Sequence, residues 1–136
     1  MPVEVVTSTE EDISHTIDRA YVFPGQGSQS VGMGAELYES SLSARETFAE
    51  ADDSLGFPLS RLILEGPATE LQNTANSQPA IMTVSIAAWR TWQDIQGLNK
   101  PAVKAVAGHS LGEYTSLVAA EVIDFSDAVR LVRRRG

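Results

Sequence analysis

The chain has 136 residues, of which 43% are hydrophobic and 21% charged, a composition typical of one globular domain. It contains no cysteine, which excludes disulfide bonds, thiolate nucleophiles and cysteine-ligated metals. The formal net charge of −8 argues against general nucleic-acid binding, and no apolar run approaches the length that spans a membrane.

The amino-terminal stretch, residues 1–19, is polar and acidic, and we predict that it is a flexible extension. A short docking segment is the alternative. The stretch has neither the layout of a signal peptide nor the basic composition of a transit peptide, so the cytoplasm is the expected location. His15 lies here and is expected to be a surface residue rather than a catalytic one.

A first strand is predicted at residues 20–23, followed by Pro-Gly-Gln-Gly-Ser-Gln at residues 24–29. The proline cannot extend the strand, and the two glycines permit unusual backbone angles. Such a loop can present backbone N–H groups to an anion, although by itself it would be only a tight turn. Its spacing matches neither a Walker loop nor the dinucleotide-binding glycine pattern.

The next part of the chain predicts short helices at residues 35–38, 43–54 and 59–64. The adjacent carboxylates of Asp52 and Asp53 are expected on a solvated surface rather than as a catalytic pair.

A polar loop is predicted at residues 73–78, and Pro79 is then expected at the first position of a long helix. Gly97 closes this helix. We expect Trp89 and Trp92 in the core rather than as a base-stacking platform. The predicted apolar stripe comprises Ile81, Val84, Ala88, Trp92 and Ile95.

The second strand, predicted as buried at residues 102–107, leads into Gly-His-Ser-Leu-Gly at residues 108–112, and a helix is predicted from residue 113 to residue 120. A G-x-S-x-G pattern between a strand and a helix is the nucleophile elbow. The turn exposes the Ser110 hydroxyl, and glycines are needed where neighbouring chain passes close. The N–H groups of the following helix can stabilise an oxyanion there. The alternative is a serine in an ordinary strand–helix loop.

A last helix is predicted at residues 124–135 and ends in an arginine run. Cations suit the end of a helix, and the alternative role is bidentate recognition of a carboxylate. Strands that alternate with helices predict an α/β fold with a parallel sheet. Two strands make a poor sheet by themselves, so we expect the chain to be a fragment of a larger domain.

Four blocks of this sequence together resemble the malonyl-CoA:acyl carrier protein transacylase family. The blocks are Tyr21–Gln29, Gln78–Ala80, Gly108–Tyr114 and Arg135–Gly136. The resemblance implies an α/β-hydrolase-like acyltransferase domain, of which residues 20–136 are the N-terminal part, with the ferredoxin-like subdomain absent.

The resemblance also implies a reaction. Ser110 is the nucleophile that takes the malonyl group from malonyl-CoA as an ester and passes it to the phosphopantetheine thiol of acyl carrier protein. The backbone N–H groups of Leu111 and Gln26 form the oxyanion hole.

Three further residues receive roles in substrate binding from the same resemblance. Arg135 holds the malonyl carboxylate and lies 25 residues after Ser110, the spacing of the family. Gln78 lies near the site. His109 is not the general base, because adjacent residues at a sharp turn point apart, and it has no more than a supporting role. Methylmalonyl is kept as an alternative to malonyl as the acyl group transferred.

The implied partners are malonyl-CoA, acyl carrier protein and a missing downstream half of the domain, with no cofactor, metal, nucleic acid or membrane. The general base of the family is a histidine downstream of this sequence, so we expect the polypeptide to be inactive or nearly so. Three alternatives stay open: a polyketide synthase acyltransferase domain, a serine hydrolase, and a non-catalytic module that docks carrier protein.

Overall fold

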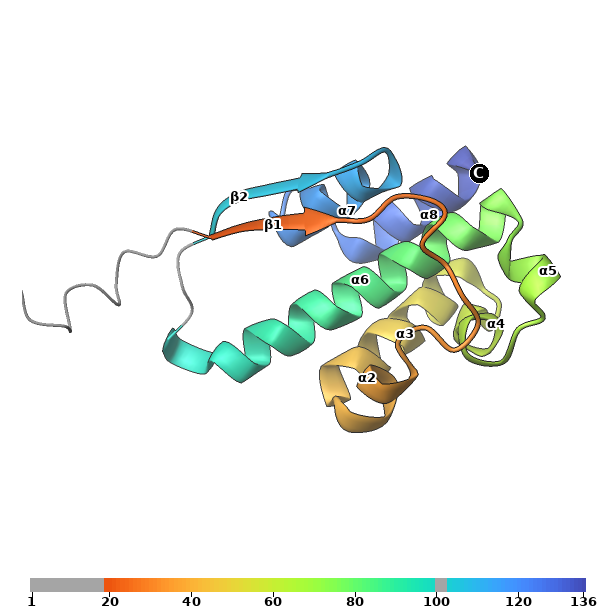
Figure 1. The fold of residues 1–136 in the computed structure, drawn as a ribbon, viewed down its shortest axis with the longest axis horizontal. Helices are drawn as coiled ribbons and strands as arrows, with labels where there is room; N and C mark the ends of the chain where they lie inside the picture. The colour runs from red at the N-terminus through yellow and green to blue at the C-terminus, as the bar shows by residue number, and fades with distance from the viewer. Residues whose placement is uncertain (1–18, 100–102) are drawn as a thin grey trace, which may run out of the picture.

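The computed structural model describes residues 19–99 and 103–136, so the predicted extension before Arg19 lies outside the described residues. The structure contains a two-stranded sheet and helices of very different lengths (Figure 1). In chain order the elements are β1 (Arg19–Phe23), α2 (Ala35–Ser40), α3 (Leu42–Leu55), α4 (Leu59–Glu65), α5 (Ala68–Leu71), α6 (Thr74–Gln96), the 3₁₀ helix η1 (Gly97–Asn99), β2 (Val103–Gly108), α7 (Leu111–Ala119) and α8 (Phe125–Arg135).

Strands β1 and β2 pair in parallel, from Arg19 opposite Val103 to Phe23 opposite Gly108. All the helices from α2 to α6 lie between them in the sequence. This arrangement confirms the predicted α/β fold with parallel strands, and residues 19–99 and 103–136 contain no second, ferredoxin-like sheet. The helix α5 is a short element that the sequence patterns do not predict.

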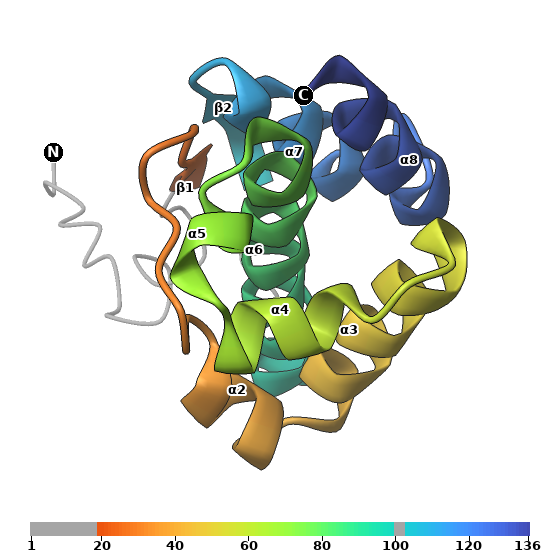
Figure 2. The same cartoon turned by 90° about the vertical axis from the view of Figure 1, so that its right-hand side faces the viewer.

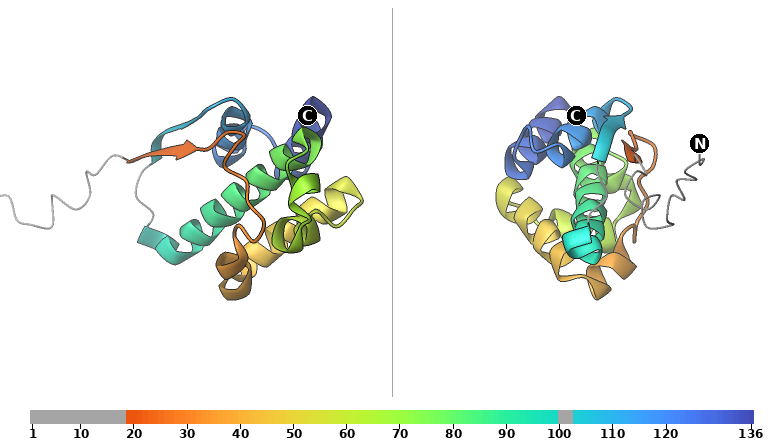
Figure 3. Two further views of the ribbon diagram at one scale, coloured as in Figure 1. Left: turned by 45° about the vertical axis from the view of Figure 1, so that its right-hand side comes forward. Right: turned by 90° about the vertical axis from the view of Figure 1, so that its left-hand side faces the viewer.

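The long helix α6 is the centre of the molecule. Views from the two ends of the molecule show the strands on one side of α6 and α3 and α8 on the other (Figure 2 and the right panel of Figure 3). The core between these elements is apolar and almost fully enclosed, and burial of such side chains is the main force that holds the helices together. Its largest members include Phe48, Leu59, Ile63, Met82, Ile86, Leu111, Phe125, Val129 and Val132.

The predicted apolar stripe of α6 is only partly correct. Ile81 is buried, but Ala88 is exposed and Ile95 is 75% exposed. A single stripe assumes one buried face, whereas α6 is contacted on several sides by α3, α7 and α8. The buried side chains of α6 therefore follow its neighbours and include Met82, Thr83, Ile86, Ala87 and Trp89.

The predicted polar loop at residues 73–78 is wrong, because α6 already begins at Thr74. Asn73 caps the helix, and its side chain accepts a hydrogen bond from the backbone N–H of Ala75 at 3.1 Å. Pro79 consequently lies inside α6 rather than at its first position. The polar residues that resemble a loop are the first turns of a capped helix.

The second strand is predicted as buried, but in β2 Val103 is 44% exposed, and Ala105 and Ala107 are exposed as well. In the neighbouring strand β1, Val22 is 80% exposed. Side chains alternate across a strand, so Tyr21 and Phe23 point the other way from Val22. They form a small cluster with Trp89, Trp92, Val106 and Ala119. Only this face of the sheet is covered by described residues.

The tryptophans of α6 pack against β1. The ring centroids of Tyr21 and Trp89 lie 4.9 Å apart, and so do those of Tyr21 and Trp92. Trp89 is buried, as predicted, and Trp92 is partly buried. No helix in the described part of the chain is both long and apolar enough to cross a membrane.

Asp52 has a structural role that corrects its expected placement on a solvated surface. Its side chain is partly buried and accepts hydrogen bonds from the backbone N–H of Ser60, at 2.7 Å, and from the Ser60 hydroxyl. Ser60 lies in the first turn of α4, where backbone N–H groups lack partners within the helix. Asp52 therefore caps α4 from the end of α3, whereas Asp53 is exposed.

We predict that Asp52→Ala lowers the free energy of unfolding by about 1 kcal/mol, the usual cost of a lost helix cap. Asp53→Ala removes the same charge from an exposed position and is the matched control. Urea unfolding of both variants measures the difference. Equal effects of the two substitutions would contradict the capping role.

Candidate active site

The turn between β2 and α7 holds Ser110 in a strained conformation. Its φ is 52° and its ψ is −105°, in a region that residues with a side chain rarely adopt. A serine before a helix usually caps that helix, but the Ser110 side chain makes no such bond. The strained backbone thus directs the hydroxyl away from α7, which is the geometry expected of an elbow.

The glycines on both sides of Ser110 are required by close contacts between backbones. A Cβ added to Gly108 would lie 1.9 Å from the carbonyl carbon of Gly112. A Cβ added to Gly112 would lie 2.2 Å from the carbonyl oxygen of Phe23. These contacts confirm the prediction that neighbouring chain passes close to the turn, and they join β1, β2 and α7 at one point.

Arg135 reaches Ser110 from the end of α8. Its Nη2 donates a hydrogen bond to Ser110 Oγ at 2.9 Å, and its Nη1 donates to Gln78 Oε1 at 3.0 Å. The guanidinium carbon also lies 5.3 Å from the centre of the Tyr114 ring, within range of a cation–π contact. Three helices therefore place a fixed positive charge beside the serine hydroxyl.

Gln78 belongs to the buried part of this site. It is only 4% exposed, and a buried side-chain amide needs hydrogen-bond partners. Arg135 supplies one of them. The structure thus brings Ser110, Arg135 and Gln78 together, although the sequence separates Gln78 from Arg135 by 57 positions.

The loop after β1 lies against the elbow. A Cβ added to Gly25 would be 2.7 Å from the carbonyl oxygen of His109, and Gly27 has a φ of 107°. Of the two glycines predicted to allow unusual backbone angles, only Gly27 has a positive φ, whereas Gly25 is needed for the close approach to His109. The Gln26 side chain points to α6, where its Nε2 donates to Thr74 Oγ1 at 3.1 Å.

Leu111 is the first residue of α7, so its N–H has no acceptor within the helix and lies at the positive end of the helix dipole. Its side chain is fully buried in the core, which fixes the position of that N–H. A backbone donor at this place suits stabilisation of an oxyanion on an acyl group attached to Ser110.

His109 faces the loop after β1 rather than Ser110. Its Cδ2 would lie 3.3 Å from a Cβ on Gly25, and its backbone N–H donates to the carbonyl oxygen of Phe23 at 3.4 Å. The side chain is exposed, and no hydrogen bond joins it to Ser110 in the described part of the chain. The second histidine of the sequence, His15, lies outside the described residues.

Two residues near the site are not predicted from the sequence. Thr74 holds the Gln26 side chain, and Tyr114 lies under the Arg135 guanidinium. The sequence does contain a pattern that could have placed Thr74 in a helix, since Asn73 before it is a preferred N-cap residue.

Comparison with known proteins identifies the origin of this arrangement. Residues 20–136 match the acyl transferase domain family. The chain belongs to this family. Its four resembling blocks, including the elbow and the loop at residues 24–29, all lie within the matched range.

Curated relatives of this acyl transferase domain include malonyl CoA-acyl carrier protein transacylases. The protein of Salmonella typhimurium is 57% identical over 117 residues, which are 86% of this chain and 37% of the relative. The protein of Bacillus subtilis is 51% identical over 117 residues, which are 86% of this chain and 36% of the relative. The chain therefore spans little more than a third of the length of these two relatives.

Solved structures show the same fold. The acyl carrier protein S-malonyltransferase of Vibrio cholerae is 52% identical and superposes with a TM-score of 0.79, covering 85% of this chain and 37% of that one. A malonyl-transacylase solved in complex with a type II polyketide acyl carrier protein is 51% identical, with a TM-score of 0.80 and the same coverage. The fold is thus the N-terminal part of a malonyltransferase-type acyltransferase domain.

We predict that Gly112→Ala lowers the free energy of unfolding by about 3 kcal/mol, because the new methyl group collides with rigid backbone. Gly56→Ala is the control, since Gly56 has a left-handed backbone, with a φ of 71° and a ψ of 21°, and open space around it. It should cost about 1 kcal/mol of backbone strain. Urea unfolding measures the stability of both variants. An equal loss of stability would show that the Phe23 backbone can move away from the new methyl group at no energetic cost.

Proposed function

We propose that this chain carries the acyl-binding serine of a malonyl transferase. Ser110 Oγ attacks the thioester carbonyl of malonyl-CoA, a C–O bond forms, the C–S bond breaks, and the proton of the hydroxyl ends on the CoA thiol. The malonyl ester then passes to the phosphopantetheine thiol of acyl carrier protein. The names of the relatives support this substrate pair, and one solved neighbour is bound to its carrier protein.

The observation that carries the proposal is the hydrogen bond from Arg135 to Ser110 Oγ at 2.9 Å. A guanidinium binds a carboxylate through two parallel N–H donors. Because Arg135 lies beside the nucleophile, a carboxylate that it holds belongs to an acyl group as short as malonyl. Acetyl lacks this carboxylate and gains nothing from the cation.

The oxyanion that forms during transfer is stabilised by backbone N–H groups of Leu111 and Gln26 in this proposal. The position of Leu111 at the start of α7 and the contact of the loop after β1 with His109 support it. Gln78 orients the Arg135 guanidinium through its side-chain oxygen. His109 supports the loop and takes no part in proton transfer.

A general base for Ser110 is missing from the proposed set of residues. His109 faces Gly25, and a serine hydroxyl without a base is a weak nucleophile. We therefore expect the 136-residue polypeptide itself to load malonyl slowly and not to reach the rate of an enzyme. A cytoplasmic location is part of the same proposal.

Polyketide synthesis is the second setting that a specific observation favours. A polyketide biosynthesis malonyl CoA-acyl carrier protein transacylase of Bacillus subtilis is 43% identical over 118 residues, covering 85% of this chain and 38% of that one. The chemistry of both settings is the same, and only the carrier protein differs. A serine hydrolase would use the same elbow but has no need of the cation beside Ser110.

Malonyl-CoA incubated with the purified chain should slowly acylate Ser110 and no other residue. Intact-protein and peptide mass spectrometry measure the ester and its position. Ser110→Ala should abolish the adduct, and Ser116→Ala, which changes another serine of the same region, should leave it. An adduct that persists in Ser110→Ala would contradict the role of the serine.

Arg135→Ala should weaken malonyl loading relative to acetyl loading by roughly ten- to hundredfold, the value of a charged hydrogen bond pair. Competition between malonyl-CoA and acetyl-CoA for Ser110 measures the ratio. Arg130→Ala removes a charge from the same helix, where Arg130 pairs with Asp127, and is the control. An unchanged ratio in Arg135→Ala would refute the role of the guanidinium.

A further inference from the structure

Pro79 leaves one carbonyl of α6 without its usual donor. In an α-helix the N–H of residue 79 would bond to the carbonyl of Ala75, but proline has no N–H. Arg133 Nη1 lies 3.4 Å from this carbonyl oxygen and donates to it. A side chain of α8 thus replaces a backbone donor of α6.

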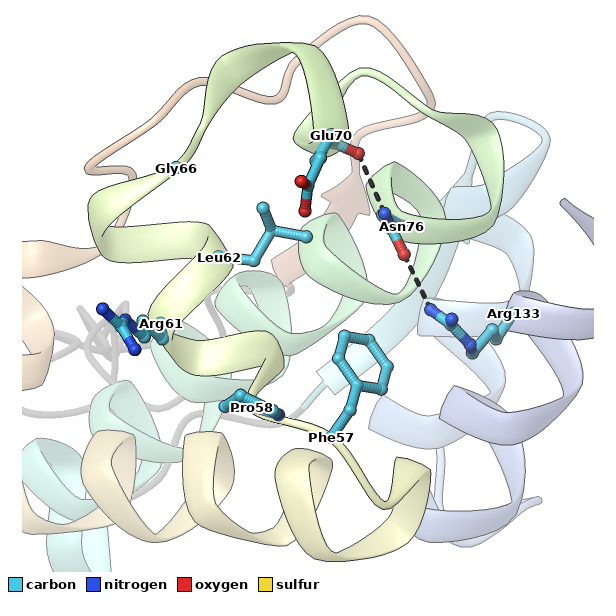
Figure 4. A pocket seen from close by; sticks show the side chains of 8 residues that line it. All are labelled: Phe57, Pro58, Arg61, Leu62, Gly66, Glu70, Asn76 and Arg133. Carbon is cyan, nitrogen blue, oxygen red and sulfur yellow. Dashed lines mark hydrogen bonds between the residues drawn. The ribbon is translucent and has the colours of Figure 1, made fainter.

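Arg133 is held at this place by further contacts (Figure 4). Its Nη1 donates to Asn76 Oδ1 at 2.7 Å, and Asn76 Nδ2 in turn donates to the carbonyl oxygen of Glu70 at 2.9 Å. The guanidinium carbon lies 4.2 Å from the centre of the Phe57 ring, close enough for a cation–π contact. These residues line a pocket of about 330 Å³.

Arg135 contacts the same turn of α6 from another side. Residues two positions apart on a helix project about 200° from each other, so Arg133 and Arg135 lie on opposite sides of α8. Arg133 holds Ala75 and Asn76, whereas Arg135 holds Gln78. The last turn of α8 therefore contacts the first turns of α6 through two arginines on opposite sides of α8.

We propose that Arg133 is a positioning residue for substrate choice: it fixes α8 against the proline-interrupted turn of α6 and so places the Arg135 guanidinium at Ser110. This inference rests on the proposed binding of the malonyl carboxylate by Arg135. A free arginine side chain has many rotamers, and ordering it costs up to about 2 kcal/mol of conformational entropy. The contacts of Arg133 fix the backbone from which Arg135 projects within reach of Gln78 and Ser110. Hydrogen bonds to these two residues then order the Arg135 side chain before substrate binds.

Arg134 is the matched control for Arg133. It carries the same charge on the next position of α8, it is exposed, and it makes no hydrogen bond or ion pair with the described residues. Replacing either arginine by glutamine changes the net charge equally. Only Arg133→Gln removes the contact with α6.

The test compares the dissociation constants of malonyl-CoA and acetyl-CoA for the purified chain, measured by calorimetry, because binding does not need a general base. Arg133→Gln should lower the preference for malonyl-CoA about fivefold, as expected for coupled neighbouring residues. Arg134→Gln should keep the preference of the unchanged chain. Arg133→Lys retains a donor for Ala75 and Asn76 and should keep most of the preference for malonyl-CoA. This result would also show that a substitution at position 133 leaves the fold intact.

A double-mutant cycle separates positioning from general stability. If Arg133 acts through Arg135, Arg133→Gln has no further effect on the preference in an Arg135→Gln background. A loss of the same size in both backgrounds would overturn the inference, and so would equal effects of Arg133→Gln and Arg134→Gln.

A second readout is independent of the proposed function. The Nε–Hε signal of Arg135 in nuclear magnetic resonance spectra of the free chain reports whether its guanidinium is held. Arg133→Gln should shift this signal toward that of exposed Arg134, and an unchanged signal would overturn the inference. If the unchanged chain shows no preference for malonyl-CoA, the proposed function fails, and this signal still decides the role of Arg133.

Discussion

The contact between two backbones at the elbow is the constraint on which the site depends. Gly108 and Gly112 touch, and Gly112 also touches the last residue of β1, so no side chain fits at either position. This contact closes the turn around Ser110 and holds its backbone at a positive φ. The same contact places the end of β1, and the loop at residues 24–29 that follows it, beside Ser110. One steric condition therefore positions two strands, one helix and the serine.

The first turns of α6 form a second centre of organisation. Thr74 holds the Gln26 side chain, Gln78 holds Arg135, and the interrupted carbonyl of Ala75 accepts from Arg133. Gln78 is buried, and a buried amide is costly unless it is bonded, which explains why α8 places a guanidinium against this turn. In the proposed reaction, the oxyanion loop and the carboxylate-binding arginine are thereby spaced by the same short stretch of helix.

The charge of the molecule is distributed unevenly. The whole chain has a formal net charge of −8, yet the last helix carries Arg130, Arg133, Arg134 and Arg135. Cations near the end of a helix also interact favourably with its dipole. A local positive field beside Ser110 attracts an anionic acyl donor, which supports malonyl-CoA as the proposed substrate.

The sequence by itself determined the elements that depend on local pattern: the parallel strands, most helices, and an elbow whose glycines and serine lie within five positions. The predicted start of α6 was wrong, because the polar residues at 74–78 resemble a loop in the sequence. In the structure, polar side chains of this stretch bind the loop after β1 and helix α8. Asp52 is a similar case, since its partner belongs to another helix. Only the tertiary structure decided that Gln78 and Arg135, 57 positions apart, meet beside Ser110. Such contacts follow from how α6 and α8 pack, and packing is a property of the whole core rather than of any local segment.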